Sequence, residues 1–131
     1  MIGNCVVTWS SRKQRVVAQS TVEAEYVALA HCTREVLFLR QLLKELGYQQ
    51  EATVVNEDNQ ACIAIAENPS HHSRVKHIDV RYYFIREHVR LENVSLEHVM
   101  SKENVADTMT KGLPREQLEY LRSKMHVKSV G

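Results

Sequence analysis

Few features of this sequence interrupt a compact fold. Its 131 residues include only four glycines and two prolines, and no stretch is repetitive or biased in composition. Since we find no linker and no internal repeat, we expect a single domain over residues 1–131. No apolar run reaches membrane-spanning length, and no charged-then-apolar signal segment opens the chain. We therefore expect an intracellular protein, cytoplasmic or nuclear, that contacts no membrane.

Cysteine and net charge are also scarce. The three cysteines, Cys5, Cys32 and Cys62, are odd in number and lack the paired spacing of zinc sites. This pattern excludes a disulfide framework, fits a reducing compartment, and predicts three small buried apolar side chains. With 17 Lys and Arg against 16 Asp and Glu, the formal net charge is +1. Nucleic-acid binding would therefore have to rest on local basic patches.

What the sequence does contain is an alternation of strand and helix signals. β-Branched or alternating apolar stretches predict strands over residues 5–11, 52–58 and 94–100. Helical periodicity predicts helices over residues 20–46, 59–68, 80–93, 103–111 and 114–125. Ser20 fits an N-cap with Glu23 completing a capping box, and Gly47 fits the residue that ends the long helix. Alternating elements predict an α/β fold with some parallel strand pairing.

Three acidic residues stand out by their position at element ends. Glu25 lies in the first turns of the long helix, Asp58 ends a strand, and Asp107 begins a helical stretch beside apolar residues. Each has an ordinary explanation, because first-turn acids suit the helix dipole and an aspartate after a strand can form a turn. Three such carboxylates at one sheet edge would also suit Mg²⁺ and two-ion cleavage of a phosphodiester. The residues alone leave both interpretations open.

Five blocks in order resemble a known family. "WSSRKQ", "STVEAEYVAL", "EDNQACIAIAENP", "HSRVKHIDVRYYFIREHV" and "ENVADTMTKGLP" are similar to the ribonuclease H domain of copia-type retrotransposon polyproteins, from about Trp9 to Leu121. The resemblance implies a ribonuclease H-like fold that cleaves the RNA strand of an RNA–DNA hybrid with two Mg²⁺ or Mn²⁺ ions. It also implies that Glu25, Asp58 and Asp107 are the metal-binding catalytic carboxylates.

The sequence departs from the family pattern at its start. The family has a fourth carboxylate, an aspartate on an opening strand upstream of W-S-S, whereas Met1 precedes Trp9 by eight residues and no acid precedes Glu23. We therefore expect an α/β remnant of three layers that lacks the first two strands. Strand exchange, a homodimer or a complementing N-terminal fragment would complete it. Hydrolysis by the isolated chain should be weak or absent, and the alternative is an inactive, domesticated or truncated module that binds nucleic acid or protein.

Two basic segments are candidates for contacts with the hybrid. Arg12 and Lys13 follow the first predicted strand, and four further residues precede or begin the third predicted helix: Arg74, Lys76, His77 and Arg81. Such side chains can bind phosphates. They can equally belong to a solvated connector and a helix surface, and the sequence does not separate these interpretations.

Overall fold

The computed structural model describes residues 2, 6–11, 13, 20–68 and 79–128. Contacts divide the chain into two compact units. Val16–His98 form one, here called the central unit, and Met1–Arg15 with Val99–Gly131 form the other, the terminal unit. Each unit is described by itself.

The central unit begins with the long helix α1, Thr21–Glu45. The Ser20 side chain accepts a hydrogen bond from the backbone N–H of Glu23 at 3.2 Å, so the predicted N-cap is confirmed. At the other end, Gly47 has φ +87°, a left-handed conformation that glycine adopts without a Cβ clash. Its N–H donates to Lys44 and that of Tyr48 donates to Leu43, which is the Schellman pattern of helix termination.

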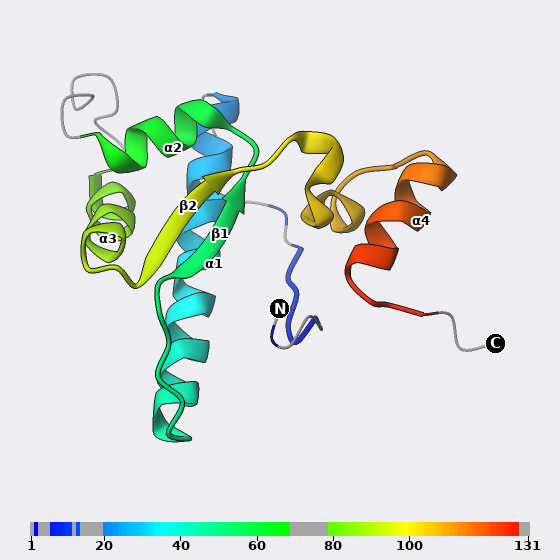
Figure 1. Ribbon diagram of the computed structural model, residues 1–131. Helices are drawn as coiled ribbons and strands as arrows, with labels where there is room; N and C mark the ends of the chain where they lie inside the picture. The colour runs from blue at the N-terminus through cyan, green and yellow to red at the C-terminus, as the bar shows by residue number, and fades with distance from the viewer. Residues whose placement is uncertain (1, 3–5, 12, 14–19, 69–78, 129–131) are drawn as a thin grey trace. The chain divides into compact units, whose positions relative to one another are not determined.

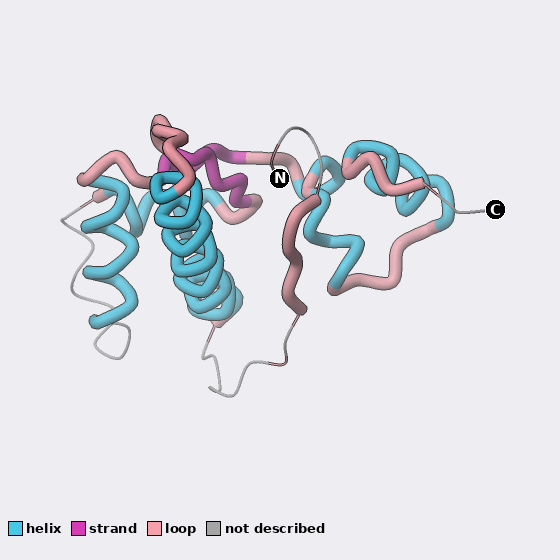
Figure 2. The backbone as a smooth tube through the Cα atoms, turned by 90° about the horizontal axis from the view of Figure 1, so that it is seen from below, coloured by secondary structure: helices cyan, strands magenta, loops and turns pink. Residues whose placement is uncertain are grey.

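A parallel pair of short strands forms the sheet of the central unit. Strands β1, Thr53–Glu57, and β2, Val94–His98, run parallel, with Thr53 opposite Val94 and Val55 opposite Leu96. Between them the chain crosses over through helices α2, Gln60–Glu67, and α3, Asp79–Arg90. The predicted parallel pairing is therefore confirmed. Parallel strands need a long crossover connection, which α2 and α3 supply. Figures 1 and 2 show α1 lying on one face of the β1–β2 pair. Helices α2 and α3 lie next to the two strands (Figure 1).

The core of the central unit lies between this face of the sheet and the three helices. Tyr26, Leu29 and Ala30 of α1 pack there with the residues that the other elements bury: Val55, Cys62, Ala66, Tyr82, Ile85, Val94 and Leu96. The rings of Tyr26 and Tyr82 stack with their centroids 5.5 Å apart. Burial of apolar side chains from five elements holds the two strands and three helices together.

The terminal unit is built from short helices. Two 3₁₀ helices, η2 (Ser101–Glu103) and η3 (Val105–Met109), precede α4, Arg115–Lys124. Leu121 of α4 and Met125 just beyond it are buried. Tyr120 donates a 2.8 Å hydrogen bond to the carboxylate of Glu103, which also pairs with Lys124 and so ties α4 to η2.

Three predictions from the sequence are wrong. Val6–Ser11 carry no strand, because β-branched residues form a strand only where a partner is available, and here Val7 and Trp9 are exposed. In place of the helix predicted over residues 103–111, η2 ends at Glu103 and η3 spans only Val105–Met109, because the side chain of Asn104 caps a new 3₁₀ turn. Cys32 is exposed, although Cys62 is buried as expected, and Cys5 is outside the described residues.

Within the described part of the chain, no helix has the length and apolar character needed to cross a membrane.

The two stacked tyrosines differ in their hydroxyl groups. The Tyr82 hydroxyl donates to the carbonyl of Ile65 at 2.8 Å, whereas the buried Tyr26 hydroxyl has no hydrogen-bond partner among the described residues. A buried polar group without a partner costs free energy, while a satisfied one contributes on the order of 1 kcal/mol. We therefore expect Tyr26→Phe to leave the free energy of unfolding unchanged or to raise it by up to about 1 kcal/mol.

The matched substitution Tyr82→Phe should lower the free energy of unfolding by about 1 kcal/mol, because the Ile65 carbonyl loses its donor. Urea unfolding followed by circular dichroism measures both. Equal losses in the two variants would show that the Tyr26 hydroxyl is satisfied in solution.

Candidate metal centre

Three carboxylates gather where α1 begins and β1 ends. Glu25 lies in the early part of α1, Glu57 is the last residue of β1, and Asp58 follows it directly. One oxygen atom from each of these carboxylates lies within 4.8 Å of the other two. The helix and the strand therefore bring Glu25 and Asp58 together as the sequence predicted, and they add a third acid that it did not.

The alternation of β1 explains why Glu57 joins the cluster. Along the strand, Val55 and Glu57 are buried, while Val54 before them and Asn56 between them are exposed. Successive strand residues point to opposite faces, so Glu57 shares the inward face with Val55. Only 6 % of Glu57 is exposed, whereas Glu25 and Asp58 are half-buried.

A tight turn fixes the geometry after β1. The backbone N–H of Asn59 donates to Oε1 of Glu57 at 3.0 Å. The side chain of Asn59 accepts hydrogen bonds from the N–H groups of Ala61 and Cys62, at 3.1 and 3.2 Å, and thereby caps α2. The turn therefore holds Glu57 and Asp58 at the point where the chain enters the helix.

The pKa of Glu57 is shifted upward. Burial, first, and then the nearby charges of Glu25 and Asp58 raise the pKa, the hydrogen bond from the Asn59 N–H lowers it, and the net pKa is about 7. Behind it, burial raises the pKa of Cys62, and the negative charges of Glu57 and Glu25 act in the same direction. Cys62 thus remains a thiol, hydrogen-bonded to Glu57.

The donor set of the cluster fits a hard divalent cation. All three groups offer carboxylate oxygens, which Mg²⁺ and Mn²⁺ prefer. On an octahedral Mg²⁺ with Mg–O distances of about 2.0–2.1 Å, adjacent oxygens lie about 2.9 Å apart and opposite ones about 4.1 Å apart. The three oxygens, now within 4.8 Å of one another, would have to move closer by side-chain rotation to bind one ion. A cation there would also relieve the mutual repulsion of the three negative charges.

The third predicted ligand, Asp107, lies in the terminal unit. It occupies the first turn of η3 and is 8 % exposed. Its Oδ2 accepts a hydrogen bond from Nζ of Lys111 at 2.8 Å. That Asp107 completes the site of Glu25 and Asp58 stays a prediction, since the two units are described separately.

Most of the predicted nucleic-acid contacts lie outside the described residues. These are Arg12, Arg74, Lys76 and His77. Of the other two, Lys13 is exposed in the terminal unit and Arg81 is half-buried on α3 of the central unit. Their role in binding a hybrid stays a prediction.

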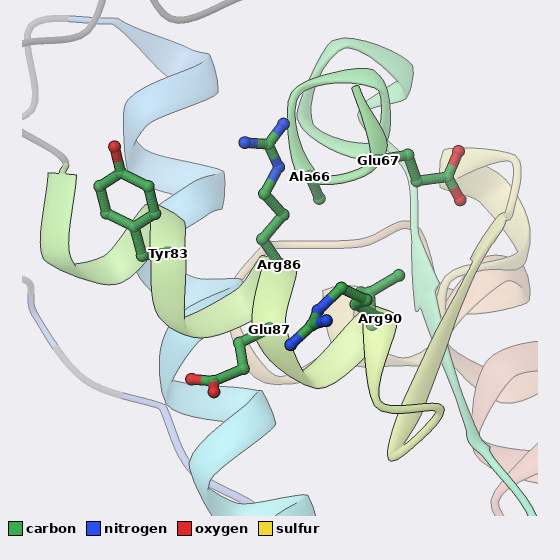
Figure 3. Close-up of a pocket in the computed structure, with 7 residues that line it drawn as sticks. Ala66, Glu67, Tyr83, Arg86, Glu87 and Arg90 are labelled. Carbon is green, nitrogen blue, oxygen red and sulfur yellow. The ribbon is translucent and has the colours of Figure 1, made fainter. Parts of the chain in front are cut away.

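A separate hollow lies between α2 and α3. Figure 3 shows its residues, among them Tyr83, Arg86 and Arg90 of α3 and Glu67 of α2. The Arg86 guanidinium packs over the ring of Tyr82 at 5.0 Å, which anchors this side of the hollow. None of the three clustered carboxylates lines it, so the hollow is distinct from the candidate metal centre.

Glu57 is the functional candidate that sequence reasoning missed. The signal was available in the period-two pattern of "TVVNE", which places Glu57 on the same face as Val55. Adjacent residues of a strand face opposite ways, so the sequence pattern separates Glu57 from Asp58, and only the turn after β1 lets both carboxylates share one site.

The raised pKa of Glu57 predicts a pH dependence of stability in metal-free protein. Between pH 4.5 and about 7 the folded state binds more protons than the unfolded state, so the free energy of unfolding falls as the pH rises. The full shift corresponds to roughly 3 kcal/mol. Glu57→Gln removes this pH-dependent contribution. The free energy of unfolding of the variant, relative to that of the unsubstituted protein, should therefore increase as the pH rises from 4.5 to about 7.

Urea unfolding in the presence of a chelator, repeated at several pH values, measures this difference. The matched control is Glu51→Gln, which changes an exposed glutamate shortly before the same strand. A stability difference between Glu57→Gln and the unsubstituted protein that stays constant with pH would contradict the prediction.

Comparison with known proteins agrees with the blocks noted in the sequence. The retrovirus-related Pol polyprotein from transposon TNT 1-94 of Nicotiana tabacum is 42 % identical over 113 residues, which is 86 % of this chain and 8 % of that protein. The corresponding polyproteins from transposons RE1 and RE2 of Arabidopsis thaliana are each 37 % identical over 98 % and 96 % of the chain, respectively. The chain spans 9 % of the length of each Arabidopsis relative.

No protein-family model matches the chain. No solved structure matches it significantly. The kinship therefore rests on these relatives, whose similarity covers nearly the whole chain. The chain is a homologue of one stretch of the retrovirus-related Pol polyproteins of copia-type transposons.

Proposed function

We propose that this chain is the ribonuclease H-like region of such a polyprotein and acts on the RNA strand of RNA–DNA hybrids. The observation that carries the proposal is the meeting of Glu25 and Asp58, two residues far apart in the sequence whose carboxylate oxygens lie within 4.8 Å of each other. Both belong to blocks that resemble the family, and Asp58 directly follows a parallel strand, the place where open α/β sheets bind ligands.

In this proposal Glu25, Glu57 and Asp58 hold a divalent cation, Mg²⁺ or Mn²⁺, and the family resemblance implies that Asp107 is a further ligand. Such cations activate water and stabilise the leaving oxygen in phosphodiester cleavage. The chain's own contribution is to fix the ligands. The N-terminal part of α1 carries Glu25, and the Asn59-capped turn holds Glu57 and Asp58.

The first test is a calorimetric titration with Mn²⁺. We expect Glu25→Gln and Asp58→Asn each to weaken binding at least about tenfold, because each removes a ligand, and loss of outer partners alone typically costs that much. Glu23→Gln is the matched control, since it changes the neighbouring helix acid outside the cluster. Absence of Mn²⁺ binding, or equal binding by all variants, would falsify the proposed site.

A labelled hybrid then separates two functions. Mn²⁺-dependent cleavage that Asp58→Asn abolishes identifies a nuclease, with a slow rate expected for the isolated chain. Salt-sensitive binding of the hybrid without cleavage identifies a binding module instead.

We further propose that the isolated chain self-associates through the free edge of β1. Among the described residues β1 pairs only with β2, so its other edge has no strand beside it. The segment Thr53–Glu57 contains no proline and no lysine, the residues that commonly protect such an edge. Phe38 and Leu42 of α1 and Leu46 at its C-cap are exposed at helical spacing and add an apolar stripe.

A second copy can pair its own β1 edge antiparallel across a twofold axis. We expect a concentration-dependent dimer by multi-angle light scattering, and Val54→Lys should weaken it by placing a charge beside the paired edge. Val80→Lys is the control. Val80 is 82 % exposed against 49 % for Val54, so general surface hydrophobicity would predict the larger effect at Val80. A monodisperse monomer at micromolar concentration would contradict the proposal.

A further inference from the structure

A buried thiol lies next to the most buried acid of the candidate metal centre. Cys62 is in the first turn of α2 and is 0 % exposed. Its S–H donates a hydrogen bond to the carboxylate of Glu57, which is itself only 6 % exposed. Because both side chains are shielded from solvent, bulk water does not compete for this hydrogen bond.

Three donors from one short stretch of chain hold the carboxylate of Glu57. The backbone N–H of Asn59 donates to Oε1 at 3.0 Å, and the N–H of Asp58 donates to the same carboxyl group. The thiol of Cys62 is the third donor, and it comes from a side chain rather than from the backbone. An ionised carboxylate has roughly four acceptor positions, so three donors leave roughly one of them for a cation.

The thiol is a donor to the centre and not one of its candidate ligands. Among the described residues, the groups whose ligand atoms lie within 4.8 Å of one another are three carboxylates, and no cysteine is among them. Burial, and then the negative charges of Glu57 and Glu25, raise the pKa of Cys62, so the thiol keeps its proton. A metal binds the thiolate, whereas the protonated thiol donates a hydrogen bond.

We propose that Cys62 is a positioning residue of the candidate metal centre, whose S–H orients the Glu57 carboxylate toward the cation. This inference rests on the proposed function, in which the clustered acids bind Mg²⁺ or Mn²⁺. A ligand that outer hydrogen bonds already hold in place loses less rotational freedom when the ion binds. Cys62 therefore increases the metal affinity without contacting the ion.

Substitutions at Cys62 separate this hydrogen bond from simple packing. Cys62→Ala removes the donor and should weaken Mn²⁺ binding about tenfold, the lower end of the usual effect of outer partners, because a thiol is a weak donor. Cys62→Ser supplies an O–H donor at the same place and should restore most of the affinity. Serine and alanine differ by one hydroxyl group, so a loss caused by packing would be similar in both variants.

The matched control is Cys32→Ala, which makes the same change at an exposed cysteine of α1 and should leave the Mn²⁺ affinity unchanged. Calorimetric titration of the full chain with Mn²⁺ measures all the affinities, after circular dichroism has shown that each variant is folded. Weaker binding by Cys62→Ala alone, with recovery in Cys62→Ser, supports the inference. Unchanged or tighter binding by Cys62→Ala, or equal weakening in Cys62→Ala and Cys62→Ser, overturns it.

Infrared spectroscopy observes the hydrogen bond itself. The S–H stretching band of Cys62 is the difference between the spectrum of the unsubstituted protein and that of either Cys62 variant. A cation bound to Glu57 withdraws negative charge from the acceptor, so the hydrogen bond should weaken and the band should move to higher frequency at saturating Mg²⁺. A band that does not move at saturating Mg²⁺ would overturn the positioning role.

The outcomes also separate this inference from the proposed function. Mn²⁺ binding that Asp58→Asn weakens and Cys62→Ala does not would retain the metal site and reject the role of the thiol. Absence of Mn²⁺ binding by the unsubstituted protein would reject both.

Discussion

The parallel pairing of β1 with β2 is the constraint on which the central unit depends. Five residue pairs fix the register, and Val55 opposite Leu96 gives the sheet one apolar face. That face buries the first half of α1, and the crossover through α2 and α3 closes the core around Tyr26 and Ile85. The same pairing determines where β1 ends, so it also places Glu57 and Asp58 beside Glu25. The candidate site is thus a consequence of the strand register.

The buried acids of the two units have different surroundings. In the central unit three carboxylates share one small space, and the cost appears as the raised pKa of Glu57, caused first by burial and then by its acidic neighbours. In the terminal unit Asp107 is almost as buried but is neutralised by Lys111. Asp107 must lose its lysine partner before its carboxylate can bind another cation.

Local signals in the sequence predicted the ends of α1 well, because residues close to each end supply the caps. Ser20 and Gly47 set the ends of α1 because a side-chain acceptor and a left-handed glycine act within a few residues. Residues 5–11 have an equally strong strand composition but form no strand over Val6–Ser11, because a strand needs a partner and composition does not supply one. The helix expected over residues 103–111 is instead broken at Asn104, whose side chain caps a short 3₁₀ helix that begins at Val105.

By itself, the sequence determined the order of elements from α1 to β2, the caps of α1, the parallel α/β pattern, and the candidacy of Glu25, Asp58 and Asp107. These follow from periodicity, capping chemistry and the family resemblance, all of which act along the chain. Only the tertiary structure decided that Glu57 joins Glu25 and Asp58, and that Lys111 covers Asp107. The first depends on which face of β1 is buried and the second on how the chain turns after η3, and both are distances through space rather than along the sequence.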